Sequence, residues 1–172
     1  MRTTKSRFFW PVLLALLLTD CSTKRLAVEH LTPPYVPHDV AGNFLRFTLA
    51  YNPGAAFSIY LGPASRVTFT LLAFVALFVL GRLYRATRPD DVWQSLALAL
   101  VCGGAAGNLL DRLTSPRGVV DFIDIGIGDV RWWTFNVADV GVTVGASLLA
   151  IVLWYRAREE QSSRDTRYEE IR

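Results

Sequence analysis

Residues 92–110 read VWQSLALALVCGGAAGNLL, an apolar run that contains no acidic or basic side chain. An α-helix needs roughly 20 such residues to cross a hydrocarbon core of about 30 Å. Two further apolar stretches of comparable length lie on either side, at residues 67–83 and 135–155. These three stretches predict three transmembrane helices.

A fourth apolar stretch, residues 8–18, is shorter because Asp20 interrupts it. It reaches the length of a span only if its helix continues through Asp20, Lys24 and Val28. We expect this continuation, because Asp20 and Lys24 are four residues apart and can pair on one helical face. The predicted fold class is therefore a mainly α membrane protein with four transmembrane helices.

The overall composition agrees with a membrane protein. Hydrophobic residues make up 52% of the 172 residues, and the mean hydropathy is +0.30. The net charge is +3, but the basic residues lie at the membrane flanks or in the mixed-charge tail, so we expect no nucleic-acid partner. The length suits one domain, residues 1–158, followed by a charged cytoplasmic tail, residues 159–172.

The basic residues also predict orientation, since they favour the cytoplasmic side of short flanking segments. They gather at the start of the chain, between the second and third spans, and after the fourth: Arg2, Lys5, Arg7, Arg82, Arg85, Arg88, Arg156 and Arg158. We expect both termini in the cytoplasm. Residues 29–66 and 113–134 then lie outside.

The N-terminus has a second interpretation, because a basic segment and an apolar run precede Cys21 as in a lipoprotein signal peptide. Asp20 argues against cleavage there, since signal cleavage favours small, uncharged residues before the cut. Cys21 and Cys102 show no spacing typical of a disulfide framework or a zinc site. We expect an uncleaved first helix and no metal or other cofactor.

The first outer segment changes character along its length. Three prolines, Pro33, Pro34 and Pro37, end the helix, and residues 43–51 then alternate in the manner of a β-strand. Residues 52–58 form a turn rich in small residues. We expect a small extracytoplasmic sheet near residues 43–60, either an ordinary hairpin or an edge that receives an extended peptide.

Polar side chains interrupt the outer ends of the spans. Asp20 and Lys24 are interpreted as an ion pair that shapes the site. Asn108 lies one turn from Asp111 and Arg112, so all three can face one interior site; the alternative is that Asp111 and Arg112 simply mark the interface.

Asp121 and Asp139 are the candidate catalytic groups. Acidic side chains near the ends of membrane segments are costly to ionise and mark functional sites. The hypothesis requires a loop or short interfacial helix after Pro116 to carry Asp121 back towards Asp139, which begins the fourth span with Asn136. Two adjoining carboxylates would retain one proton and could activate a water against a peptide bond.

The chain resembles the bacterial lipoprotein signal peptidase family, also called signal peptidase II. Five motifs carry the resemblance, in order: Asp20-Cys21-Ser22-Thr23-Lys24, Asn52-Pro53-Gly54-Ala55-Ala56-Phe57, Gly107-Asn108-Leu109-Leu110-Asp111-Arg112, Gly118-Val119-Val120-Asp121-Phe122 and Phe135-Asn136-Val137-Ala138-Asp139. The resemblance implies an inner-membrane aspartyl endopeptidase that cuts a prolipoprotein just before a cysteine carrying diacylglycerol.

The resemblance also implies roles for single residues. Asp121 and Asp139 would be the catalytic dyad, and Asp20, Lys24 and Asp111 would shape the site. Substrate binding would fall to Asn52, Gly54, Asn108, Arg112 and Asn136, and the same pocket would take peptide-like inhibitors such as globomycin. The expected partners are diacylglyceryl-prolipoproteins and membrane lipids. Cys21 stands where the family often has glutamine, and Val140-Gly141 replaces a serine-containing continuation.

Two other classes remain open. A small channel or proton-translocating subunit also carries Asp, Asn and Arg within its membrane segments, but spreads them through the membrane depth. A purely structural subunit would use the glycine-rich third span for packing. The gathering of polar residues at the outer ends favours the peptidase.

Overall fold

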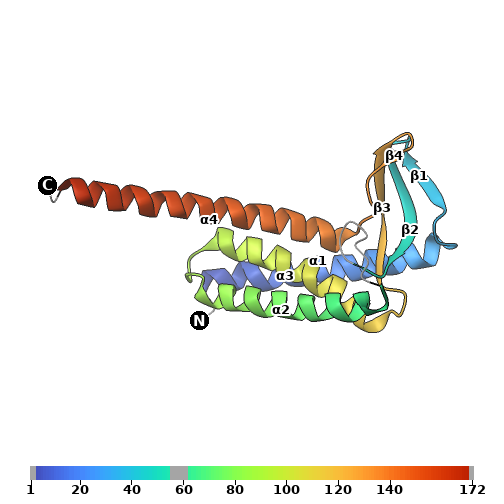
Figure 1. Cartoon of the computed structure of the whole chain (residues 1–172), viewed down its shortest axis with the longest axis horizontal. Helices are drawn as coiled ribbons and strands as arrows, with labels where there is room; N and C mark the ends of the chain where they lie inside the picture. The colour runs from blue at the N-terminus through green and yellow to red at the C-terminus, as the bar shows by residue number, and fades with distance from the viewer. Residues whose placement is uncertain (1–2, 55–61, 171–172) are drawn as a thin grey trace.

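The computed structural model describes residues 3–54 and 62–170, which form four long helices and a small sheet. The helices are α1 (Thr4–His30), α2 (Ser65–Ala86), α3 (Val92–Thr114) and α4 (Val137–Glu170), with a short 3-10 turn, η2 (Gly62–Ala64), before α2. The helices lie side by side in one bundle, and the sheet stands at the end remote from both termini (Figure 1). The mainly α fold class is thus confirmed, including the small sheet.

Within the described ranges, three helical segments are long and apolar enough to cross a membrane: Gly62–Ala86, Val92–Thr114 and Val137–Arg164. The first helix, α1, continues through Asp20 and Lys24 to His30 as expected, which gives it a length of about 40 Å at 1.5 Å per residue. The charged residues in the second half of α1 make it too polar to be counted with these three apolar segments. The fourth crossing therefore remains a prediction for α1.

The third helix, α3, lies at the centre of the bundle and packs against α1, α2 and α4. Its small residues allow the close approach that the sequence predicts. A Cβ atom added at Gly104 would overlap the backbone oxygen of Ala138 in α4, and one added at Gly107 would overlap the Asp20 carboxylate of α1. The glycines therefore set how near the first turn of α4 lies to α1 and α3.

The sheet consists of β1 (Pro37–Ala41), β2 (Leu45–Asn52), β3 (Val119–Ile127) and β4 (Val130–Arg131), in that order and antiparallel. The predicted strand at residues 43–51 is confirmed as β2. Residues 55–60 of the predicted segment near 43–60, including Ser58, lie outside the described residues. Strand β1 was not predicted, because it begins at a proline and is exposed throughout, which is the pattern of an edge strand.

Asp121 lies in strand β3, and the expectation of a loop or short interfacial helix after Pro116 was wrong. Gly118 turns the chain with a φ of 99°, and β3 then pairs with β2 so that Ala50 lies opposite Asp121. Val119, Val120 and Phe122 are buried. A strand buried on both faces shows no alternation, so only the β-branched composition of the run VVDFIDIGI indicated it.

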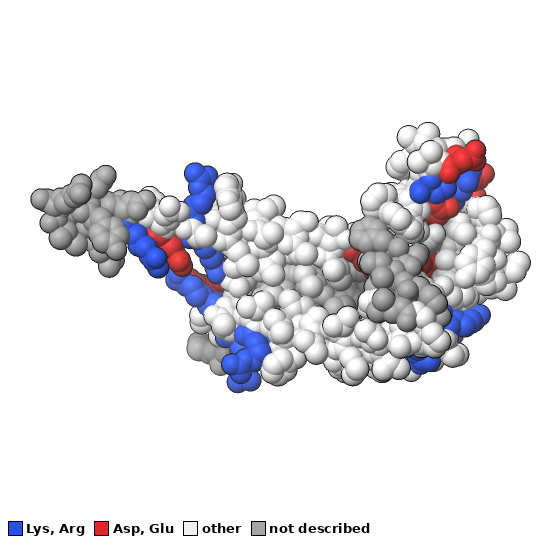
Figure 2. Space-filling model, in the orientation of Figure 1, with Lys and Arg blue, Asp and Glu red and all other residues white. Residues whose placement is uncertain are grey.

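The bundle is tied together at the end opposite the sheet. Lys5 donates hydrogen bonds to the backbone oxygens of Tyr84 and Thr87 at the end of α2, at 3.1 and 2.7 Å. Asp91 caps α3 through the Gln94 N–H and forms an ion pair with Arg156 of α4. Figure 2 shows basic side chains gathered at this end, followed by an uncharged zone along the bundle. Helix α4 continues through the predicted domain boundary at residue 158.

The contact at Gly104 gives a test of this packing. Gly104→Ala forces α3 away from α4, so we expect a loss of about 1–3 kcal/mol in the free energy of unfolding. Gly81→Ala in α2 is the matched control, because an added Cβ atom there meets no atom within 4 Å. Thermal unfolding in one detergent should show a lower Tm for Gly104→Ala alone. Equal Tm values for the two variants would contradict the packing.

Candidate functional site

Asp139 is held at the start of α4 by a reciprocal pair of hydrogen bonds. The Asp139 N–H donates to Oδ1 of Asn136 at 2.9 Å, and the Asn136 N–H donates to Oδ2 of Asp139 at 3.1 Å. This is a capping box, in which two backbone donors of a helix N-terminus are satisfied by each other's side chains. The spacing of three residues therefore fixes the carboxylate of Asp139 at the end of the helix.

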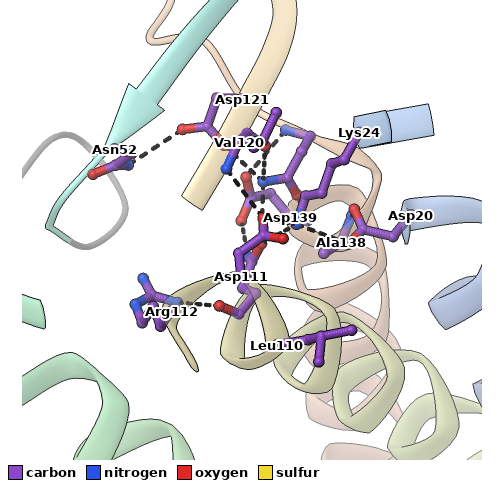
Figure 3. A network of polar contacts seen from close by, with 12 residues as sticks. Asp20, Lys24, Asn52, Leu110, Asp111, Arg112, Val120, Asp121, Ala138 and Asp139 are labelled. Carbon is purple, nitrogen blue, oxygen red and sulfur yellow. Dashed lines mark hydrogen bonds and ion pairs between the residues drawn. The ribbon is translucent and has the colours of Figure 1, made fainter. Parts of the chain in front are cut away.

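Asn136 also joins Asp139 to Asp121. Its Nδ2 donates to Oδ1 of Asp121 at 2.6 Å, and Nδ2 of Asn52 donates to the other Asp121 oxygen at 3.3 Å. Asn136 is fully buried and Asp121 is 4% exposed. The two candidate carboxylates thus meet one asparagine. Figure 3 shows Asp121 and Asp139 in one network of polar contacts, with Asn52 beside Asp121.

Asn108 of α3 completes this arrangement. Its Nδ2 donates to Oδ1 of Asp139 at 2.8 Å, and its Oδ1 accepts from Asn136 at 3.1 Å and from Lys24 at 2.8 Å. Both Asp139 oxygens therefore accept N–H hydrogen bonds. The side chain of Asn108 connects the carboxylates to the charged residues of α1.

Lys24 lies between two carboxylates, as Figure 3 shows. Its Nζ is 2.8 Å from Asp20 and 2.9 Å from Asp111, and both Asp20 and Lys24 are buried. Asp20 accepts a hydrogen bond from the Ala138 N–H, and Asp111 accepts one from the Val120 N–H. We call Asp20, Lys24 and Asp111 the charge cluster. It joins α1 and α3 to the first turn of α4 and to β3.

Arg112 follows Asp111 in α3 and makes different contacts from those of the charge cluster. It donates to the backbone oxygens of Asn108 and Gly54, at 3.1 and 2.9 Å. The sequence allowed Asn108, Asp111 and Arg112 to face one interior site. The structure brings Asn108 and Arg112 to a common cavity, whereas Asp111 is directed to Lys24 and β3.

The cavity, which we call the dyad cavity, has a volume of about 460 Å³ and is lined by both candidate carboxylates. Asn52, Asn108 and Arg112 add polar groups to its wall. Its apolar wall was missed in the sequence: Val119, Ile125, Trp132, Trp133, Phe135, Val140, Val142 and Val144. The doublet Trp132-Trp133 was the available signal, since exposed tryptophans are typical of membrane interfaces.

Burial changes the acidity of Asp121. Burial, and next to it the nearby charge of Asp139, raise the pKa of this carboxyl to about 7. Hydrogen bonds from Asn136 and Asn52 and the charge of Lys24 lower the pKa, but they offset only part of the rise. Asp121 is therefore a carboxyl that exchanges its proton near neutral pH.

The chain is similar to known proteins in sequence and in fold. The sequence profile of the family described as signal peptidase (SPase) II matches residues 12–155. The chain belongs to the signal peptidase II family. It is 36% identical to the lipoprotein signal peptidase of Pseudomonas syringae pv. tomato over 167 residues, which covers 95% of each chain. It is 40% identical to that of Coxiella burnetii over 161 residues, or 89% of this chain and 95% of the relative.

Two solved structures have a similar fold. One structure of a bacterial membrane enzyme matches with a TM-score of 0.75 and 28% identity, over 85% of this chain and 87% of the other. A second matches with a TM-score of 0.73 and 27% identity, over 89% and 97% of the two chains. The chain is therefore an integral membrane peptidase of the signal peptidase II family, as its sequence motifs indicated.

Lys24 provides a test of the charge cluster. Lys24→Met leaves Asp20 and Asp111 without their common cation, so we expect a loss of about 3–5 kcal/mol in the free energy of unfolding. Arg25→Met is the matched control, because it removes only an exposed ion pair with Glu29, worth about 0–1 kcal/mol. Thermal unfolding of both variants measures the difference. A Lys24→Met protein as stable as Arg25→Met would refute the structural role of the cluster.

Proposed function

We propose that this signal peptidase II is an intramembrane aspartyl endopeptidase that removes the signal peptide from diacylglyceryl-modified prolipoproteins. Asp121 and Asp139 are the catalytic dyad, and the cut precedes the lipidated cysteine. The observation that supports the proposal best is that Asn136 donates hydrogen bonds to both carboxylates, and that both carboxylates line one cavity. Cleavage of such a substrate by the purified protein tests it.

The placement of the dyad suits this substrate. We propose that α1 is the fourth crossing, and that both termini lie in the cytoplasm of a bacterial inner membrane. The dyad residues belong to β3 and to the first turn of α4, which meet at the sheet end of the bundle (Figure 1), so the dyad then lies at the outer interface. A lipidated cysteine is held at the same depth, because its acyl chains remain in the bilayer. Polar residues concentrated at one end of the spans also favour a peptidase over a channel.

Each carboxyl has a defined role in the proposed reaction. Asp139 begins ionised and removes a proton from a water, whose oxygen attacks the scissile carbonyl carbon. Asp121 begins protonated, because burial keeps its pKa near 7, and donates its proton to the carbonyl oxygen. As the tetrahedral intermediate collapses, Asp139 gives its proton to the leaving amine and Asp121 recovers one from the intermediate's hydroxyl. The pair then holds one proton, as at the start.

The polar wall of the dyad cavity is proposed to bind the peptide backbone around the cut. Arg112 presents a guanidinium fixed by Gly54 and Asn108, and such a fork can donate to substrate carbonyls. Asn52 and Asn136 hold Asp121 from two sides. Peptide-like inhibitors such as globomycin would occupy this wall.

The dyad is tested by removing one carboxylate at a time. Asp121→Asn and Asp139→Asn each remove a group that must carry a proton, so we expect each to lower cleavage of a diacylglyceryl prolipoprotein by at least about a hundredfold. Asp129→Asn, at a turn between β3 and β4, should cleave normally. Retained cleavage in either dyad variant would remove that residue from the mechanism. A chelator should have no effect, and inhibition would indicate a metal.

The proton on Asp121 predicts how the rate depends on pH. Since the reaction needs Asp121 protonated, kcat/KM should fall as the pH rises through about 7. The Asn52 hydrogen bond lowers the pKa of Asp121, so Asn52→Ala should move this alkaline limb to higher pH. The pH profiles of both proteins measure the shift. An alkaline limb that moves to lower pH in Asn52→Ala would contradict the assignment of the proton.

A further inference from the structure

Asp124 and Arg131 form an ion pair within the sheet, outside the dyad. Nε of Arg131 lies 2.9 Å from Oδ1 of Asp124, and the side chains of Arg131 and Asp124 are 17% and 11% exposed. Removing two charges from water to this extent carries a desolvation cost, which additional hydrogen bonds have to offset. The pair is therefore costly to form, and it has no part in the proposed reaction.

The remaining polar atoms of the pair also have partners. Arg131 donates a second hydrogen bond to the backbone oxygen of Asp124, at 3.0 Å, and a third to the backbone oxygen of Asn43. The other carboxylate oxygen of Asp124 accepts from the Thr48 hydroxyl at 3.3 Å. The planar guanidinium thus joins β4 to β3 and to the turn before β2.

Gly126 leaves room for the Arg131 side chain to cross β3. The two residues lie opposite each other in the β3–β4 register. Asp124 is two residues from Gly126 and so lies on the same face of the strand, where a long side chain from the next strand can reach it. A Cβ atom added at Gly126 would lie 2.9 Å from Cδ of Arg131. A side chain at position 126 would therefore obstruct the path of the arginine to Asp124.

The two residues that follow Arg131 form part of the wall of the dyad cavity. Trp132 and Trp133 line this cavity, and their ring centroids are 5.4 Å apart in an edge-to-face contact. The Trp132 N–H donates to the Ile125 oxygen at 2.8 Å. Trp132 and Trp133 are 53% and 50% exposed, so packing covers only about half of each. Their positions therefore depend strongly on the backbone that carries them.

This backbone is attached to β3 at both ends. At one end Arg131 is held by Asp124, and at the other Phe135 and Ile123 exchange backbone hydrogen bonds of 2.8 and 3.0 Å. Asn136, which contacts both carboxylates of the dyad, comes after the second attachment. Loss of the first attachment would therefore displace the two tryptophans, whereas the second would keep the dyad in place.

We infer that Asp124 and Arg131 are a positioning pair, which holds Trp132 and Trp133 at the dyad cavity and so determines how tightly the apolar part of the substrate binds. This inference rests on the proposed peptidase function. Within the described part of the chain, neither member of the pair lines the cavity. Loss of the pair should therefore weaken substrate binding without changing the chemical step, which appears as a higher KM at unaltered kcat.

Asp124→Asn tests the pair, because it removes the negative charge and keeps the size of the side chain. We expect KM for a diacylglyceryl prolipoprotein to rise about tenfold, an effect typical of a changed apolar pocket, while kcat stays the same. Asp39→Asn is the matched control, since it breaks an exposed ion pair with Arg46 in the same sheet, and it should change neither constant. An unchanged KM in Asp124→Asn, or a loss in kcat alone, would overturn the inference.

A double-mutant cycle tests whether the pair acts through the tryptophans. Trp132→Ala/Trp133→Ala should itself have a raised KM. Adding Asp124→Asn to this double variant should raise KM no further, because the side chains that it would displace are already gone. A tenfold rise in KM in both backgrounds would mean that the pair acts by another route, and the inference would be wrong.

Arg131→Lys covers the case in which Asp124→Asn does not fold. Lysine keeps a cation beside Asp124 but lacks the planar fork that reaches three oxygens together, so we expect a smaller rise in KM at unaltered kcat. If the unaltered protein cleaves the prolipoprotein and this variant has the same KM, the inference alone fails. If the unaltered protein cleaves no prolipoprotein, the proposed peptidase function fails, and the inference fails with it.

Discussion

The capping of α4 by Asn136 is the interaction on which the site depends. The buried side chain of Asn136 accepts a hydrogen bond from the Asp139 N–H in the first turn of α4 and donates one to the Asp121 carboxylate. The backbone N–H of Asn136 donates to the Asp139 carboxylate. A fully buried amide has to use its donors and its acceptor within the protein, because unpaired polar groups are costly away from water. The relative position of the two carboxylates therefore follows from the start of a helix and does not depend on a mobile loop.

The charge cluster supports this helix start from behind. Removing Lys24, Asp20 and Asp111 from water carries a desolvation cost, which close ion pairs of 2.8 and 2.9 Å and two backbone hydrogen bonds offset. The close approach of α1, α3 and α4 at Gly104 and Gly107 makes these contacts possible. Small residues of the helix bundle thus determine the geometry of the charge cluster.

Local patterns in the sequence predicted much of this arrangement. The four-residue spacing of Asp20 and Lys24 indicated their ion pair, the apolar runs indicated the helices, and the alternation at residues 43–51 indicated β2. The strand nature of β3 was missed because a strand buried on both faces lacks alternation. The contact of Asn136 with Asp121 and the pairing of Lys24 with Asp111 join segments far apart in the chain, and no local spacing reveals such contacts. The apolar wall of the dyad cavity was missed for the same reason.

The central claim is that the dyad retains one proton near neutral pH, and that Asp121 carries it. Infrared spectroscopy of protein labelled at the aspartate side-chain carbons observes a protonated carboxyl directly. We expect a protonated-carboxyl band that disappears as the pH rises through about 7 and that is missing from Asp121→Asn. A band that persists unchanged in Asp121→Asn, or spectra with no protonated aspartate below pH 7, would contradict the account.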